Sequence, residues 1–370
     1  MEAIVTKLLS EAGIRINGSR PFDIQVRHPD FYQRVLTGGS MALGESYMDG
    51  WWDCEALDQF FYRLLRIRLD RTTRLPAATT LRLIAPIILS HLKARFRAYE
   101  IGQRHYDTGN NLFERMLDRR LNYSCAYWRP GDDLDAAQER KLALTCRKLK
   151  LKPGMRVLDI GCGWGAFAFY AAEKFGVEVT GITVSRQQVD YCRQHVGRLP
   201  VKVHYKDYRT LRDRFDRIVS IGMFEHVGFA NYRTYMRVVR RCLKPGGIFL
   251  LHTIGSNRSV RSVDPWISKY IFPNSMVPSA HQIMAASEGL LVLEDWHSFG
   301  AHYDPTLMAW HSNFVSRWED IKACYSERFY RMWTYYLLVS AGSFRARRNQ
   351  LWQIVFSRNG LQGGYEAVHL

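Results

Sequence analysis

The chain lacks the cysteine spacing that marks a disulfide framework or a zinc site. Its seven cysteines are odd in number, and none forms a CxxC pair or a Cys/His ligand set. A disulfide-rich secreted scaffold and a structural zinc protein are therefore not expected, and a reducing cytoplasm fits best. The N-terminus also lacks a basic stretch followed by an apolar segment and a cleavage site, so we expect no secretory signal.

Long apolar runs and several catalytic signatures are absent as well. The longest apolar run, LIAPIILSHL from Leu83, covers about ten residues and contains Pro86, whereas a spanning helix needs roughly 20. We therefore expect no membrane-spanning helix. The sequence has no [DN]PPY, P-loop, HExxH or GxSxG motif, which argues against nucleic-acid amino-methyltransferases, P-loop NTPases, zinc proteases and nucleophile-elbow hydrolases.

Positive charge, by contrast, is in excess. The formal net charge is +17, from 52 Lys and Arg against 35 Asp and Glu. This balance indicates an anionic partner, either nucleic acid, an acidic lipid surface or an acidic substrate, and a merely soluble basic protein is the alternative. Arginines interleave with Leu and Ile over residues 63–104, which suits a surface-docking basic linker or a solvated helix packed on the next domain.

The spacing of apolar residues divides the chain into three predicted parts. Residues 1–62 have helix-spaced apolar positions broken by NGSRP and TGGS turns, which predicts a small helical domain. The basic linker, 63–104, follows, and residues 105–370 are the expected catalytic domain. After Leu149, short β-branched runs alternate with helical stretches, which is typical of βαβ units and a mostly parallel sheet. The predicted fold class is therefore α/β.

Seven strands are predicted in this third part. The first five are MRVLDI, VEVTGIT, VKVHYKD, FDRIVSIG and GIFLLHTIG. Two closing strands, LLVLEDWHSFG and LWQIVFSRNG, have helices inserted between them from about residue 303 to residue 345.

The first of these strands ends in a glycine-rich turn, DIGCGWG, that runs into a helix. Glycines at such a switch let a ligand lie against the backbone, and Asp159 stands at the strand end. Because S-adenosylmethionine has no pyrophosphate for the helix N-terminus to hold, the turn suits it better than a dinucleotide; a tight turn without a ligand is the alternative. Later strand ends offer Thr183 and Gln188 to ribose hydroxyls. Asp207 and Tyr208 are either adenine contacts or plain caps.

Three further polar residues are expected at the same edge of the sheet. Glu225 follows the fourth strand, His252 ends the fifth, and Tyr303 lies on a segment that folds over that edge. A lone His on an apolar strand is more often a satisfied core residue, but parallel strands present their carboxyl ends together, so convergence is expected. Aromatic residues nearby either bound a long apolar substrate, face a cation or belong to the core. They are Tyr123, Tyr127, Trp128, Trp164, Phe224 and Tyr270.

Nine longer motifs extend over nearly the whole chain. They are AGIRINGS, LGESYMDGWWD, HYDTGNNLF, YSCAYW, LKPGMRVLDIGCGWG, RIVSIGMFEHVG, KPGGIFLLHTIG, DPWISKYIFPN and YDPTLMAW. These motifs closely resemble the bacterial cyclopropane fatty acid synthases, and the likeness is weakest at about residues 66–95. The resemblance implies a Rossmann-like class I methyltransferase fold, and GESYMDGWW separates the phospholipid enzymes from shorter mycolic acid relatives.

The resemblance also implies a reaction. A methylene from S-adenosylmethionine is added across the cis double bond of an unsaturated acyl chain in a membrane phospholipid. The alkene is a poor nucleophile, so it must be aligned with the sulfonium methyl, and water must be excluded from the carbocation that forms. A base then removes a proton from the transferred methyl, and the family implies bound bicarbonate in that role. The implied ligands of bicarbonate are Glu225, His252 and Tyr303, with Cys125 and Ile254 contributing through the backbone.

The resemblance implies contacts and partners for the rest of the molecule. The implied donor contacts are Tyr123, Ser124, Asp159, Gly161, Gly163, Trp164, Gly165, Thr183, Gln188, Asp207 and Tyr208. The excess of Lys and Arg then suits peripheral binding to an anionic membrane, on its inner, cytoplasmic face. A homodimer is expected, with the N-terminal domain helping to bind lipid and to dimerise, and no nucleic-acid partner.

Three alternatives stay open. A methyl-branched acyl chain would form if a hydride shift and a reduction followed, but no flavin or nicotinamide partner is evident. A nucleic-acid methyltransferase would explain the charge, but [DN]PPY and a recognisable RNA module are missing. A lipid-surface binding protein with a relic donor site would not need Glu225, His252 and Tyr303 together.

Overall fold

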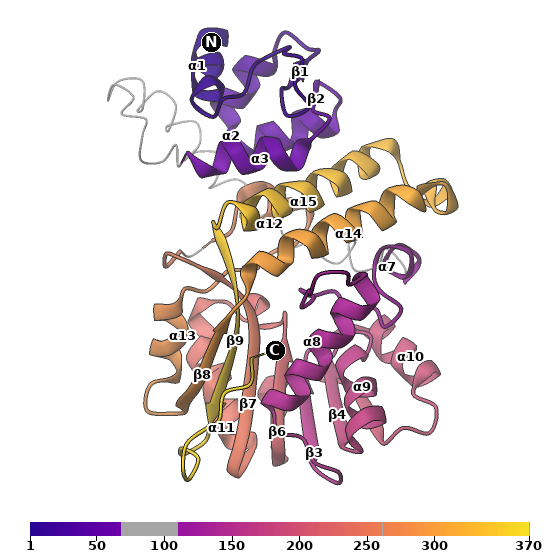
Figure 1. The fold of residues 1–370 in the computed structure, drawn as a ribbon, viewed down its shortest axis with the longest axis vertical. Coiled ribbons are helices and arrows are strands. Elements are labelled where there is room, and N and C mark those ends of the chain that lie inside the picture. Colours follow the sequence, from indigo (N-terminus) through magenta and orange to yellow (C-terminus); the bar gives the residue numbers. More distant parts are fainter. Residues whose placement is uncertain (68–109, 261, 370) are drawn as a thin grey trace. The chain divides into compact units, whose positions relative to one another are not determined.

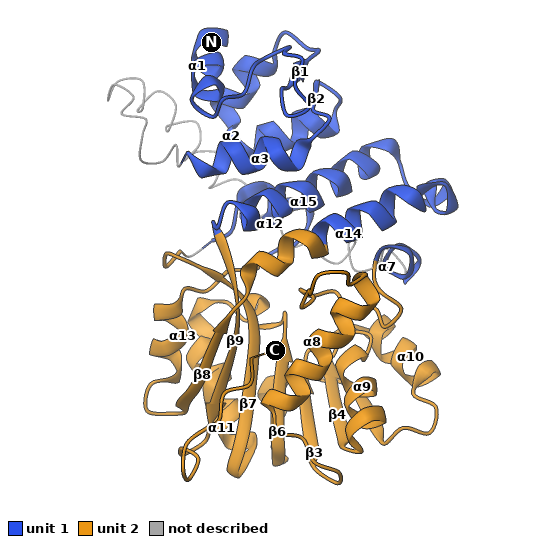
Figure 2. Cartoon of the chain, in the orientation of Figure 1, with its two compact units in different colours: residues 1–116, 262–274, 307–348 blue, residues 117–261, 275–306, 349–370 orange. Residues whose placement is uncertain are grey.

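A computed structural model describes residues 1–67, 110–260 and 262–369 (Figure 1). Its contacts divide the chain into two compact units (Figure 2). Unit 1 comprises Met1–Met116, Ser262–Asn274 and Leu307–Arg348, and unit 2 comprises Leu117–Arg261, Ser275–Thr306 and Asn349–Leu370. All the predicted site residues belong to unit 2.

Unit 2 is built on a seven-stranded sheet with the strand order β5-β4-β3-β6-β7-β9-β8. The strands are β3 (Arg156–Ile160), β4 (Glu178–Thr183), β5 (Val201–Tyr205), β6 (Phe215–Ile221), β7 (Leu243–Ser256), β8 (Val292–Ser298) and β9 (Asn349–Ser357). The first five pair in parallel, and β9 runs antiparallel to both β7 and β8. The prediction of a mostly parallel α/β sheet is confirmed.

The helices of unit 2 include α8 (Leu134–Lys148), α9 (Ala166–Phe175), α10 (Arg186–His195), α11 (Tyr232–Cys242) and α13 (Ala280–Ser287). Polar side chains that the sequence supplies cap the start of α8, α10 and α13. The Asp133 carboxylate accepts the Ala136 N–H at the start of α8, and Ser279 forms a capping box with Gln282 at the start of α13. These caps satisfy amide groups that would otherwise lack partners.

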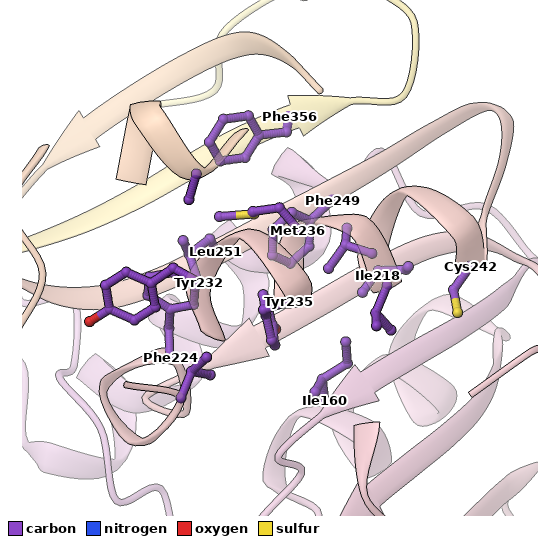
Figure 3. Packing of buried hydrophobic residues seen from close by; sticks show 14 of the residues in the cluster. Ile160, Ile218, Phe224, Tyr232, Tyr235, Met236, Cys242, Phe249, Leu251 and Phe356 are labelled. Carbon is purple, nitrogen blue, oxygen red and sulfur yellow. The ribbon is translucent and has the colours of Figure 1, made fainter. Parts of the chain in front are cut away.

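Side chains alternate between the two faces of each central strand. Leu251 packs in a cluster with α11 and α13, part of which Figure 3 shows. Val157 and Leu250 pack in a second cluster with α8 and α9. Since alternate residues of a strand share a face, Asp159 and His252 lie on the α8 face of the sheet.

In its described residues, unit 1 is helical apart from one small antiparallel pair. Its elements are α1 (Glu2–Glu11), β1 (Gln25–Val26), α2 (Phe31–Met48), β2 (Trp52–Asp53), α3 (Leu57–Arg66), α7 (Asn110–Met116), α12 (Pro265–Tyr270), most of α14 (Tyr303–Ser316) and α15 (Glu327–Arg345). Gly342 on α15 permits a close approach to α3, because a Cβ there would lie 2.7 Å from the Phe61 Cβ. The Tyr335 ring meets Phe61 edge-on with 5.1 Å between centroids, so α3 and α15 share one aromatic core.

The compact units cut across the predicted domain division. Residues 262–274 and 307–348 group with the N-terminal helices, because α15 packs on α2 and α3 and α12 packs on α2. The predicted basic linker lies mostly outside the described residues, and its first residues, 63–66, continue α3. The boundaries at 62 and 104 therefore stay predictions. Within the described ranges, no helix is long and apolar enough to cross a membrane.

Candidate active site

The glycine-rich turn after β3 has the backbone conformation that its sequence predicts. Gly161, Gly163 and Gly165 all have positive φ angles, of 85°, 54° and 85°, which other residues rarely adopt. A Cβ on Gly161 would lie 2.7 Å from the side chain of Met223, whereas no described atom lies within 4 Å of the Cβ position of Gly163. The turn thus exposes its backbone at Gly163, where a ligand can approach.

Asp159 and Lys141 are buried charges beneath this turn. Burial raises the pKa of the Asp159 carboxyl to about 7 even though the positive charge of Lys141 opposes the shift. Burial likewise lowers the pKa of Lys141 to about 8. The Lys141 ammonium donates to Asn122 Oδ1 at 2.7 Å and to Ser124 Oγ at 3.0 Å. Lys141 on α8 therefore holds Ser124, a predicted donor contact, in place.

The predicted ribose and adenine contacts lie at the ends of β4 and β5. The Thr183 hydroxyl donates to Gln188 Oε1 at 2.6 Å, so the predicted pair is already preorganised. The carboxylate of Asp207 accepts from Arg209 Nη2 at 2.7 Å, and the Tyr208 ring packs on Tyr235 with 5.1 Å between centroids. Asp207 is thus a cap with an ion-pair partner in this structure.

Glu225 lies in a single 3-10 turn after β6 and is buried beside the end of β7. Its Oε1 accepts the Ile254 N–H at 2.6 Å, and its backbone carbonyl accepts the Met276 N–H at 2.7 Å. Oε2 is buried without a hydrogen-bond partner among the described residues. Burial raises the pKa of this carboxyl to about 7, although the hydrogen bond from Ile254 opposes the shift. Glu225 can therefore be either a proton donor or a proton acceptor near neutral pH.

His252 is 1% exposed near the end of β7. It pairs in register with Ile221 of β6, and its carbonyl accepts the Gly222 N–H at 3.0 Å, which holds β7 beside the segment that leads to Glu225. Burial, reinforced by the positive charges of Lys141 and Lys148, puts the imidazole pKa well below its ordinary value. The ring is therefore neutral at physiological pH.

The YSCAYW stretch is tied to the segment that carries Tyr303. The Ala126 N–H and the Trp128 indole both donate to Thr306 Oγ1, at 3.1 and 2.9 Å, and the Trp128 N–H donates to His302 Nδ1 at 2.8 Å. Buried Tyr303 stands between His302 and Thr306 at the start of α14.

The aromatic ring of Phe299 joins this assembly to His252. Its centroid lies 5.2 Å from that of Tyr127 and 5.8 Å from that of His252. The stretches that carry Cys125, Tyr303 and His252 therefore form one packed group at the carboxyl edge of the sheet.

Cys125 has the environment of an inert thiol. It is fully buried, and its Sγ donates to the Ala126 carbonyl at 3.3 Å. Burial raises the pKa of the thiol well above its ordinary value, despite the opposing hydrogen bond with Thr306. Since thiolate is the reactive form, a nucleophilic role is not supported.

The structure also brings in polar residues that the sequence did not single out. The buried face of α8 carries Gln138, Lys141, Thr145 and Lys148, at spacings of three and four. Gln138 Nε2 donates to the Ser124 carbonyl at 2.8 Å, and Gln353 Nε2 on β9 donates to Thr145 Oγ1 at 3.0 Å. Polar residues at helix spacing on a core-facing stripe are the signal that could have identified this set.

A family model and a curated relative both match this chain over most of its length. Residues 93–354 match the family described as mycolic acid cyclopropane synthetase. The chain is 56% identical over 361 residues to the cyclopropane-fatty-acyl-phospholipid synthase of Escherichia coli (strain K12), which covers 98% of this chain and 94% of the relative.

Solved structures match in fold as well. The cyclopropane synthase MmaA2 from Mycobacterium tuberculosis has a TM-score of 0.66 and 30% identity, covering 70% of this chain and 98% of its own. The mycolic acid cyclopropane synthase CmaA1 complexed with SAH and CTAB has a TM-score of 0.65 and 31% identity, covering 71% and 98%. The predicted class I methyltransferase fold is thereby confirmed. The chain therefore belongs to the mycolic acid cyclopropane synthetase family and is an S-adenosylmethionine-dependent enzyme of the cyclopropane fatty acid synthase type.

Proposed function

We propose that the protein transfers a methylene group from S-adenosylmethionine to the cis double bond of an unsaturated acyl chain in a membrane phospholipid, forming a cyclopropane ring. The observation that carries the proposal is the 56% identity to a phospholipid-modifying synthase over 98% of the chain. The buried Glu225 and His252 beside the donor turn supply the dry, polar edge that such a reaction needs.

The donor would be held along the carboxyl ends of β3, β4 and β5. Tyr123 and Ser124 would cover its methionine end, above the turn that contains Trp164 and the three positive-φ glycines. Thr183 and Gln188 would bond the ribose. Asp207 and Tyr208 would contact the adenine, and Asp207 would then share its oxygens with the Arg209 side chain.

Bicarbonate fits the buried group around Glu225. Glu225 Oε2 and His252 Nε2 are buried atoms without partners in the described part of the chain, and such atoms indicate a polar ligand. The chemistry that bicarbonate supplies when bound is that of a base for the proton of the transferred methyl group. Glu225, His252 and Tyr303 would hold it, together with the Cys125 backbone.

The protein's own contribution follows from burial. A neutral Glu225 donates a hydrogen bond to an anion, whereas an ionised one would repel it, and the raised pKa favours the neutral form up to about pH 7. Because Ile254 already donates its N–H to Glu225, we assign Ile254 the role of orienting that carboxyl. A fixed negative charge held here would stabilise a carbocation on the lipid without solvent reorganisation.

The net charge of +17 supports peripheral binding to an anionic membrane, on its cytoplasmic side. We further propose that the N-terminal region, residues 1–62, contributes to lipid binding and to a homodimer. Size measurement in solution and vesicle sedimentation with and without anionic lipid test these two proposals separately.

The decisive experiment incubates the purified full chain with methyl-labelled S-adenosylmethionine and vesicles of a monounsaturated phospholipid, followed by mass analysis of the released fatty acids. Ring formation adds one CH₂ group and removes the alkene. Vesicles of the saturated phospholipid are the matched control and are expected to stay unlabelled. A product with two further hydrogens would indicate methyl branching, and labelled RNA with untouched lipid would refute the proposal. Removal of bicarbonate from the buffer is expected to slow turnover, and its return to restore it.

A further inference from the structure

Gln353 lies next to His252 in a row of polar side chains across three strands. The β7–β9 register pairs His252 with Gln353, and the β8–β9 register pairs His297 with the same residue. Two residues further along, Leu250 and Val355 both pack in the cluster formed with α8 and α9. By strand alternation His252 and Gln353 therefore face α8, where Thr145 lies.

The hydrogen bonds of Thr145 determine which end of the Gln353 amide faces it. The Thr145 hydroxyl donates its one proton to the Lys141 carbonyl at 2.8 Å. With that proton on the Lys141 carbonyl, Thr145 Oγ1 accepts from Gln353, so the amide nitrogen, at 3.0 Å from Thr145 Oγ1, is the group that faces it. Gln353 Oε1 is then buried without a partner among the described residues. The reverse orientation would put two acceptors against each other unless the hydroxyl turned its proton away from Lys141.

This orientation determines the tautomer of His252. The same Gln353 nitrogen lies 3.3 Å from His252 Nδ1. An amide NH₂ can only donate, so Nδ1 must be the unprotonated nitrogen and Nε2 must carry the proton. Lys141 and Lys148, which act on the ring from the α8 face, disfavour a second proton. His252 is thereby a fixed donor through Nε2, an atom buried without a partner in the described ranges.

We propose that Gln353 is a positioning residue that holds His252 in the Nε2–H tautomer, so that the imidazole donates a hydrogen bond to the anionic ligand of the site and does not take its proton. The inference rests on the proposed role of His252. It assigns a division of labour, because a histidine locked as a donor cannot compete with bicarbonate as the base. In enzymes where a partner fixes a histidine tautomer, the wrong tautomer severely impairs catalysis.

The test reads the tautomer directly in the full-length protein, without turnover. The protein is labelled with ¹⁵N-histidine, and the His252 signals among the 12 histidines are identified by their loss in His252→Asn. The ¹⁵N shifts of the two ring nitrogens report which one carries the proton. In the wild type we expect the proton on Nε2. In Gln353→Glu the facing group becomes an acceptor, so we expect the proton on Nδ1 or a doubly protonated ring.

Two variants that introduce no charge keep the test possible if Gln353→Glu does not fold. Thr145→Val removes the hydroxyl that orients the amide, and Gln353→Met removes the amide while keeping its length. Both are expected to give a mixture of tautomers in a folded protein. The kcat of methylene transfer should fall about tenfold or more in Gln353→Glu and less in Thr145→Val, with the KM for S-adenosylmethionine little changed.

A wild-type His252 with its proton on Nδ1 would overturn the inference, as would folded variants that keep the Nε2–H tautomer. Addition of bicarbonate to the labelled protein tests the proposed ligand separately from the tautomer. A shift of the Nε2 signal on titration supports the proposed ligand. If the signal does not respond while the tautomer is as expected, the bicarbonate proposal fails and the contact between Gln353 and His252 stands.

Discussion

Buried carboxyls have opposite surroundings in unit 1 and at the donor turn of unit 2. In the described part of unit 1, each partly buried carboxylate has a cationic partner. Glu45 accepts from Lys269 and from the Tyr270 hydroxyl at 2.6 and 2.8 Å, and Asp49 pairs with Arg328 at 2.9 Å. Burial raises the pKa values of Glu45 and Asp49, but these partners outweigh it, and both end below their ordinary values.

In unit 2, no cationic partner among the described residues outweighs burial for the two carboxyls near the donor turn, Glu225 and Asp159. Burial raises the pKa values of Glu225 and Asp159 to about 7, and it lowers that of Lys141 to about 8. A buried group whose charged form is disfavoured costs stability at neutral pH, whereas a paired group contributes to it. The difference separates charges that hold helices together from charges kept reactive, because only the second kind can exchange a proton near pH 7.

Glu225→Gln gives the sharpest test of this contrast and the largest expected effect. The amide cannot exchange a proton with the site, so we expect kcat to fall by about 100-fold or more, measured as labelled methyl incorporated into unsaturated phospholipid. The matched control is Glu294→Gln, which alters a half-buried carboxylate bonded to Ser357 and the Leu361 N–H, and should keep activity within about twofold. Equal losses in both variants would mean that general disruption, not proton exchange, causes the effect.

The same residue makes a prediction about stability and pH. The folded pKa of Glu225, about 7, lies above its ordinary value of 4.5, so the folded state binds more protons between these two pH values. The contribution of Glu225 to the free energy of unfolding is therefore fully present below about pH 4.5 and is lost as pH rises through 7. The total loss is about 3 kcal/mol. Urea unfolding from pH 4.5 to 7.5 should show a shallower decline in Glu225→Gln than in the wild type. Parallel curves would show that Glu225 ionises normally in the folded protein.

In unit 1, a charged residue with several partners should contribute to stability. Arg331 donates to the Tyr47 and Trp52 carbonyls and to Asp53 Oδ1, at 2.6, 3.0 and 2.6 Å. We expect Arg331→Met to lower the free energy of unfolding by about 2 kcal/mol, because several charge-assisted bonds are lost together. Arg27→Met is the matched control: Arg27 also pairs with Asp53, but its side chain is 67% exposed, so a loss under about 0.5 kcal/mol is expected. Similar losses of unfolding free energy in the two variants would contradict the distinction between a charge with several buried partners and an exposed ion pair.

The sequence predicted the sheet well because its strands are short, β-branched and separated by glycine turns, and it predicted which strand ends would share an edge. It did not predict that α8 would turn Lys141, Thr145 and Lys148 inward, because charged residues in a helix usually face solvent. The partner of Thr145 is Gln353, 208 residues away, and such a pairing is created only by the register of β9. The grouping of α15 with α3 was missed for a similar reason, since the fit of Gly342 against Phe61 is a property of packing.

Cys125→Ser should have the smallest effect of the set. If the thiol were a reactive group like Glu225, the substitution would abolish activity. Cys125 would then have to be counted with Glu225 among the buried groups that take part in the chemistry. Its full burial and raised pKa argue instead that the backbone of Cys125 matters, and serine preserves that backbone with a smaller polar atom. We therefore expect activity within about tenfold of the wild type and a stability loss of about 1 kcal/mol, because a buried hydroxyl replaces a thiol. Thermal unfolding separates the two effects: a stable, fully inactive serine variant would assign chemistry to the thiol and contradict the backbone role.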